Sequence, residues 1–181
     1  MPASITSLKP TVTRDEAARK LKGFVREIRR GRLALIVEFY IPYRLFETFI
    51  TNADVTVTKV MAIDAVTGAL DPYAFDQPPA ASEREIISSE RALEAALSEA
   101  RSLELLEEKI KRGLYLKGFF RVKNPQVRGL YLETIHVPYW VGVYRQGDKA
   151  WIEALNAVRG QREGSKVREI ITEWFHTHGR R

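Results

Sequence analysis

The chain has 181 residues, of which 45% are hydrophobic and 10% aromatic, and it contains no cysteine. This length and composition predict a globular protein of one large or two small domains with a packed core. The lack of cysteine excludes disulfides, thiolate nucleophiles and cysteine-based metal sites. The net charge of +6 divides into +3 over residues 1–75, −3 over residues 76–112 and +6 over residues 113–181. Such a basic balance favours contact with polyanions, but it is also common in proteins that bind none.

The first 20 residues lack the apolar segment of a secretory signal, and no stretch reaches the roughly 18 uninterrupted apolar residues of a membrane-spanning helix. We therefore expect a cytoplasmic protein without a membrane span.

A helix is predicted over residues 13–31. Thr13-Arg14-Asp15-Glu16 fits a capping box, the apolar residues that follow repeat at three and four, and Gly31 is a typical exit. The apolar period then changes to two, which predicts strands over 33–41, 43–50 and 55–63. The first of these is apolar on most of both faces and is expected to be central, with Pro42 as a bend or edge after it. Residues 1–75 thus read as a helix-plus-three-strand unit.

The proline-rich residues 76–82 predict a linker to a second unit over residues 83–181. Ser82-Glu83-Arg84-Glu85 resembles another capping box, and apolar residues at helical spacing predict a long helix from there to Gly113. Four strands are predicted between Leu114 and Asn156, and a closing helix that Ser165 can cap. The last six residues, 176–181, are expected to be a frayed tail.

An imperfect repeat relates the two units. Ile41-Pro42-Tyr43 precedes Asp64-Ala65-Val66-Thr67-Gly68, and Val137-Pro138-Tyr139 precedes Asn156-Ala157-Val158-Arg159-Gly160. We expect Pro42 to superpose on Pro138 and Gly68 on Gly160, with the intervening loop absorbing the difference of four residues in spacing. The predicted fold class is α+β, with two related helix-plus-antiparallel-sheet units and the C-terminal helix packed on the sheet.

No residue pattern indicates a catalytic centre. Glu173 and His176 could share a helix face and His178 could join them, but two groups near a chain end make a poor metal site, so we expect no metal and no cofactor. His136 is expected to be a hydrogen-bonded histidine of a strand. Asp64 and Asn156 precede glycine turns, where such side chains usually bond to the turn backbone.

Aromatic and basic side chains are the remaining candidates for binding. Aromatic residues with arginines on a sheet can stack bases or grip a peptide, and they can equally be core. The candidate ligand-binding residues are Tyr139, Trp140, Tyr144, Arg145, Tyr43 and Arg44. The residues that would contact nucleic acid are Arg26, Arg29, Arg30, Arg32, Arg159, Arg162, Lys166 and Arg168.

The run Asp64-Ala65-Val66-Thr67-Gly68-Ala69-Leu70 at a hairpin, after a helix, resembles the Asp-x-x-Thr-Gly-x-apolar turn of PepSY-type modules of cystatin-like topology. The resemblance implies a tandem of small binding or regulatory units, and it transfers no functional residue. We therefore expect a non-catalytic binding or scaffolding protein with an unidentified protein or peptide partner. The alternatives are a nucleic-acid-associated basic protein and an enzyme with an unrecognised carboxylate site.

Overall fold

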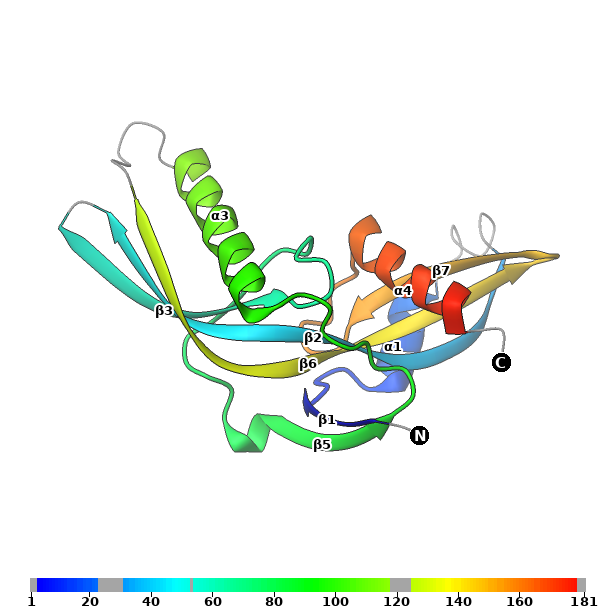
Figure 1. Ribbon diagram of the computed structural model, residues 1–181. Coiled ribbons are helices and arrows are strands. Elements are labelled where there is room, and N and C mark those ends of the chain that lie inside the picture. The colour runs from blue at the N-terminus through cyan, green and yellow to red at the C-terminus, as the bar shows by residue number, and fades with distance from the viewer. Residues whose placement is uncertain (1–2, 23–30, 53, 118–124, 179–181) are drawn as a thin grey trace. The chain divides into compact units, whose positions relative to one another are not determined.

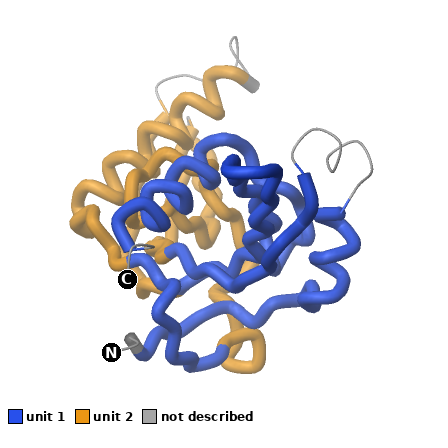
Figure 2. The backbone as a smooth tube through the Cα atoms, turned by 90° about the vertical axis from the view of Figure 1, so that its right-hand side faces the viewer, with its two compact units in different colours: residues 1–41, 85–93, 136–181 blue, residues 42–84, 94–135 orange. Residues whose placement is uncertain are grey.

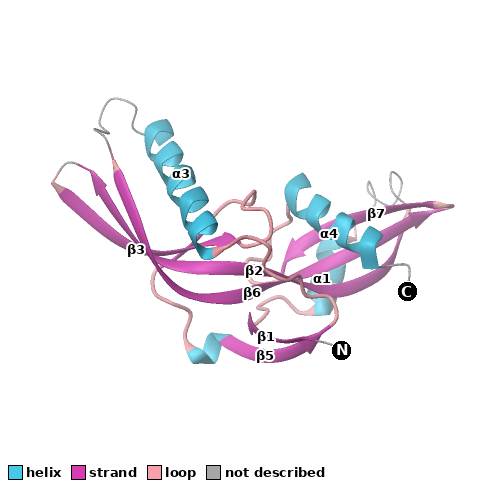
Figure 3. Cartoon of the chain, in the orientation of Figure 1, coloured by secondary structure: helices cyan, strands magenta, loops and turns pink. Residues whose placement is uncertain are grey.

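The computed structural model describes residues 3–22, 31–52, 54–117 and 125–178. Within these residues the chain has the predicted α+β architecture, with a mixed sheet ordered β4-β3-β2-β6-β1-β5 and β7 paired to β6 (Figures 1 and 3). The helices are α1 (Arg14–Leu21), the 3-10 turn η1 (Ala81–Glu83), α3 (Glu99–Lys117) and α4 (Ser165–His178). The strands are β1 (Ala3–Leu8), β2 (Arg32–Asn52), β3 (Val55–Asp64), β4 (Tyr73–Phe75), β5 (Arg84–Ser89), β6 (Gln126–Gln146) and β7 (Lys149–Asn156). None of the described helices is long and apolar enough to cross a membrane.

The chain folds into two compact units that alternate along the sequence (Figure 2). Unit 1 comprises residues 1–41, 85–93 and 136–181, and unit 2 comprises residues 42–84 and 94–135. Strands β2 and β6 each contribute one half to each unit. This arrangement differs from the consecutive units 1–75 and 83–181 expected from the sequence, because two long strands carry the chain from one unit into the other.

Both long strands continue through a proline, although Pro42 was expected to bend or end its strand. Over Tyr43–Asn52, β2 pairs with β3, whereas Tyr40 bridges in parallel to Ala92. Pro42 lies between these two pairings. Proline has no backbone N–H, and at this position neither pairing needs one. Pro138 lies likewise between the parallel pair of Ser7 with His136 and the antiparallel pairing of β6 with β7. The position of each proline therefore explains why its strand is unbroken.

The two repeated turns have the same local geometry. Ala65 N donates to the Pro42 carbonyl at 2.8 Å, and Ala157 N donates to the Pro138 carbonyl at 2.9 Å. Gly68 and Gly160 adopt left-handed φ values of 65° and 66°. The four-residue difference in spacing lies in the strands and not in a loop, because the ladder from Tyr43 to Asp64 has two more residue pairs than the ladder from Tyr139 to Asn156. Duplication of the complete units stays a prediction.

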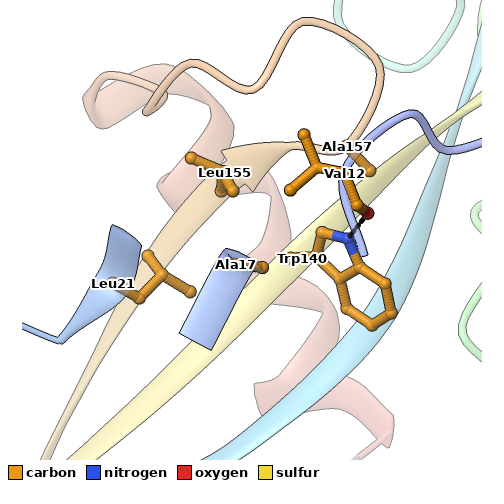
Figure 4. Packing of buried hydrophobic residues seen from close by; sticks show 6 residues of the cluster. All are labelled: Val12, Ala17, Leu21, Trp140, Leu155 and Ala157. Atoms are coloured by element: carbon orange, nitrogen blue, oxygen red, sulfur yellow. Dashed lines mark hydrogen bonds between the residues drawn. The ribbon is translucent and has the colours of Figure 1, made fainter. Parts of the chain in front are cut away.

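The core of unit 1 forms where α1 packs against the sheet. Thr13 caps α1 as predicted, its hydroxyl accepting from Glu16 N while the Glu16 carboxylate accepts from Thr13 N at 2.9 Å. Figure 4 shows the apolar side chains of this cluster, which are Val12, Ala17, Leu21, Trp140, Leu155 and Ala157. Helix α4 begins at Ser165 and buries Val167, Ile170 and Ile171, whose helical spacing places them on one face. The Trp174 ring packs edge-on against Phe39 at 5.2 Å between centroids.

The core of unit 2 forms where α3 packs against its part of the sheet. The buried members of this cluster are Phe46, Ile63, Leu106, Ile110 and Val127. Gly129 lies in β6 at this interface, where an added Cβ would come within 2.5 Å of Leu103. The absence of a side chain therefore allows the helix to approach the strand closely.

Several predicted elements were wrong. The long helix does not start near Ser82, because residues 84–89 form β5 and α3 starts only at Glu99. β-Branched Ile86 and Ile87 suit a strand, and Glu83, not Glu85, reaches back to accept from Ala80 N at 2.7 Å. Gly113 does not end the helix, since one interior glycine costs only about 1 kcal/mol; Leu114 and Leu116 are therefore helical. The expected tail is helical as far as His178. The predicted helix over 13–31 ends at Leu21, where Lys22 takes an extended backbone conformation, so the helix is not continuous; residues 23–30 lie outside the described residues.

Candidate functional site

A free strand edge in unit 1 is the candidate site. Strand β2 has β6 on one side along the sheet, and on its other side β3 pairs only with Tyr43–Asn52. Before that ladder, the described residues place only the single bridge from Tyr40 to Ala92 on this side. The first half of β2 was expected to be central, but over Leu33–Phe39 it is an edge among the residues that the structure describes. Free edges present unpaired backbone groups to which another strand can bind.

The backbone groups on this edge can be assigned from alternation along the strand. Tyr40 N donates to the Arg91 carbonyl at 2.9 Å, and the Tyr40 carbonyl accepts from Leu93 N at 3.0 Å. In a β-strand every second residue directs its N–H and C=O to the same side, so the groups of Glu38 and Ile36 face the free edge too. One of the Arg14 guanidinium nitrogens lies 3.4 Å from the Ile36 carbonyl oxygen. No turn, loop or bridge residue among those described accepts a hydrogen bond from the N–H groups of Ile36 and Glu38.

An open groove of about 970 Å³ runs along this edge. One wall is the stretch of β2 from Leu35 to Tyr40, and the other is formed by β5 and the residues after it, from Ile87 to Arg91. Arg14 and Trp140 complete the lining. This volume is at the upper end of the roughly 300–1,000 Å³ typical of binding pockets. The groove therefore combines a free backbone edge with enough room for an extended segment.

The base of the groove is held by buried contacts. Trp140 is buried in the core cluster of unit 1, and its indole N–H donates to the Val12 carbonyl at 2.7 Å (Figure 4). Ile36 packs against the same cluster. Tyr144, also on β6, is buried and donates its hydroxyl to the Leu21 carbonyl at 2.6 Å. These contacts fix α1 against the sheet beneath the open edge.

Acidic groups lie at the Tyr40 end of the groove. The Tyr40 hydroxyl donates to the Glu38 carboxylate at 2.9 Å. Burial, this hydrogen bond and the negative charges of Glu38 and Glu85 together raise the pKa of the Tyr40 phenol far above its usual range. Tyr40 is therefore a neutral donor that orients the Glu38 carboxylate. Among the described residues, no cation lies within ion-pair distance of Glu38.

Most of the predicted ligand-binding residues lie in the core. Tyr43, Tyr139, Trp140 and Tyr144 are all buried, so the choice left open by the sequence is decided in favour of core. The Tyr43 ring packs edge-on against Tyr73 at 5.2 Å. Because all four rings are buried, they do not form the exposed aromatic surface that was predicted. Trp140 lines the groove only as part of its base.

The two predicted arginines lie in different units. Arg145 is exposed near the end of β6 in unit 1. Arg44 in unit 2 is largely buried, donates to the Leu97 carbonyl at 2.6 Å and lies 3.8 Å from the Glu99 carboxylate. Arg44 thus stabilises the segment that leads into α3, and this structural role accounts for the arginine without any bound ligand.

The predicted nucleic-acid residues do not form one described surface. Arg26, Arg29 and Arg30 lie outside the described residues, and Arg32 is exposed at the start of β2. Arg168 pairs with Glu153 at 3.3 Å. Arg159 and Lys166 are exposed and each has an interaction partner, whereas Arg162 is half-buried, with one terminal nitrogen buried and without a hydrogen bond.

The groove residues Ile36, Glu38, Ile87 and Glu90 were not singled out from the sequence. A usable signal was present, because Glu38 is the one charged residue in the apolar run from Leu33 to Ile41. A charge within such a run is a common protection of an edge strand. The facing wall, some 50 residues later, carries no comparable signal.

The groove offers hydrogen-bonding backbone, apolar side chains and charged side chains. Its serines, Ser88 and Ser89, have no histidine among the lining residues to activate them. Within the described part of the chain, no three histidine or carboxylate side chains are grouped so as to hold a metal ion. Comparisons of this chain with protein-family models, with curated proteins and with solved structures found no match.

Proposed function

We propose that this protein is a non-catalytic binding protein that takes up an extended segment of a partner protein as an added strand along β2. The observation that carries the proposal is the free edge at Ile36 and Glu38, which opens onto a groove of about 970 Å³. In strand addition, backbone hydrogen bonds supply affinity and pockets for alternate side chains supply specificity. The groove provides both kinds of contact.

The neighbouring chain supports this mode of binding. Arg91 and Leu93 already bond to the backbone of Tyr40, which forms a single parallel bridge at Ala92, so the same edge accepts an extended segment at one position. Among the described residues, no further strand pairing joins the two walls, so the edge before that bridge is open. An incoming segment would extend the pairing that Arg91 and Leu93 begin, over a base that is already ordered by Trp140 and α1.

Tandem modules are part of the same proposal. The Asp64 carboxylate accepts from the backbone N–H groups of Thr67 and Gly68 at 2.8 and 2.9 Å, which orders the turn that resembles PepSY-type modules. Asn156 accepts from Val158 N and Arg159 N in the same way, at 3.1 and 2.9 Å. The equivalent turns favour a duplicated binding module whose first copy has diverged from its second.

Peptide selection tests the proposal. A displayed library of random peptides would be selected on the immobilised full chain, and enriched peptides would be labelled and titrated by fluorescence anisotropy. We expect enrichment of extended sequences rich in β-branched residues. Methylating the backbone nitrogen of alternate residues in such a peptide should abolish binding for one set of residues and spare it for the other, because only one set donates to β2.

Matched variants localise the binding. Leu35→Asp places a charge in the groove at a side chain that is 50% exposed, and Val57→Asp places the same charge on β3 of unit 2 at a side chain that is 45% exposed. The groove variant should lose binding and the β3 variant should keep it. The proposal would be wrong if selection yields no binder, or if both variants bind like the original chain.

A further inference from the structure

We infer that the added strand carries a basic side chain opposite Glu38, with an apolar side chain two residues away. This inference rests on the proposed function and specifies its ligand. Glu38 lies in the lining of the groove and is half-buried, and one of its oxygens accepts from the Tyr40 hydroxyl at 2.9 Å. That single bond leaves most of the acceptor capacity of the carboxylate unused.

Charge in the groove is distributed unevenly along β2. Glu38 is hydrogen-bonded to Tyr40, and the negative charge of Glu85 also acts on the Tyr40 hydroxyl. Glu90 lines the same groove. Two cations also line the groove. Arg14 contacts the carbonyl of Ile36, and Arg91 is exposed on the facing wall. Among the described residues, neither lies within ion-pair distance of Glu38. A partly desolvated carboxylate without a cation gains most from a charged donor, since such hydrogen bonds are about twice as strong as neutral ones. A lysine or arginine of the incoming strand would supply this donor.

The pleat of the strand sets the spacing of the motif. A residue of the added strand that lies beside Glu38 has its side chain on the same face of the sheet. The next residue on that face of the incoming strand would meet Ile36, which packs on the apolar core cluster. In the other direction the place opposite Tyr40 is taken by Ala92. The added strand is taken to run parallel to β2, as the bridge at Ala92 does. Read from its N-terminus, the ligand motif is then apolar–x–basic, and the basic residue lies at the closed end.

Two synthetic peptides that differ at one residue test the inference. The probes are labelled acetyl-Ser-Thr-Val-Thr-Lys-Thr-Ser-amide and its Lys-to-Glu counterpart, together with Lys and Glu versions of the best peptide from the library selection. We expect the lysine peptides to bind at least about tenfold more tightly than the glutamate peptides. The preference should shrink as salt is added, because the charges are partly exposed.

Variants of the protein assign the preference to Glu38. Glu38→Gln keeps an acceptor for Tyr40 and should abolish the preference, whereas Glu38→Lys should reverse it. Glu47→Lys changes a half-buried glutamate on the same strand outside the groove and should leave the preference intact. Circular dichroism would verify that each variant is folded. Equal binding of lysine and glutamate peptides would overturn this inference and leave strand addition standing, while a failure of every selected and synthetic peptide to bind would overturn both.

Discussion

Replacing Asp64 by alanine should lower the free energy of unfolding by about 4 kcal/mol. Asp64 is fully buried, and one of its oxygens accepts from Gly68 N at 2.9 Å while the other accepts from Leu70 N at 2.9 Å. Each buried donor that loses its acceptor costs about 1–3 kcal/mol, so these two bonds alone account for the estimate. The bonds from Thr67 lie nearer to solvent, and water can replace them.

The equivalent change at Asn156 should cost less, about 2 kcal/mol. The Asn156 side chain accepts from Val158 N and Arg159 N at 3.1 and 2.9 Å, and both bonds are only partly buried. The two alanine substitutions should therefore lower the free energy of unfolding by different amounts, although the turns have the same local geometry. An amide N–H that is more deeply buried costs more when it loses its acceptor.

Urea unfolding would measure both effects. The three tryptophans, Trp140, Trp151 and Trp174, belong to unit 1, so their fluorescence follows that unit, whereas far-ultraviolet circular dichroism follows both. With a slope of about 2 kcal/mol per M, Asp64→Ala should move the circular dichroism midpoint by about 2 M. Asp76→Ala changes an exposed aspartate and is the matched control. A shift below about 0.5 M for Asp64→Ala, or an equal shift for both turn variants, would refute the reasoning from buried amides.

Three further predictions concern pH, packing and nucleic acid. Burial lowers the pKa of His136, so the unfolded chain binds a proton at a higher pH than the folded chain does. The free energy of unfolding should therefore be greatest above about pH 6.5 and should fall as the pH drops below that value. His136→Gln should weaken this fall in a plot of the urea midpoint against pH. If the urea midpoint of that variant fell with pH as steeply as that of the original chain, His136 would not be the cause. Tyr144→Phe should cost about 1–2 kcal/mol through the lost bond to Leu21, whereas Tyr115→Phe on an exposed ring should cost almost nothing, as urea unfolding would show. A short single strand and a short duplex should bind only weakly in an anisotropy titration, and submicromolar binding at about 0.15 M salt would favour the nucleic-acid alternative.

The parts of the fold that were predicted correctly depend on residues close together in the sequence. The capping box at Thr13 and Glu16 needs only one helical turn, and the buried stripe of α4 needs only its own spacing. The turn at Asp64 likewise closes on amides within six residues. Local hydrogen bonds and periodicity were sufficient in these segments because the chain satisfies them without distant partners.

Features that depend on contacts between residues far apart in the sequence were decided by the tertiary structure alone. Ile86 and Ile87 lie in a strand and not in a helix, because β5 joins the sheet beside β1. Pro42 does not interrupt β2, because its nitrogen faces the gap between two strand partners. The candidate groove brings Glu38 opposite residues 87–91, and no local signal relates these two segments. Sequence periodicity reports which face of a strand is apolar, but whether its edge stays open depends on where another part of the chain stops pairing.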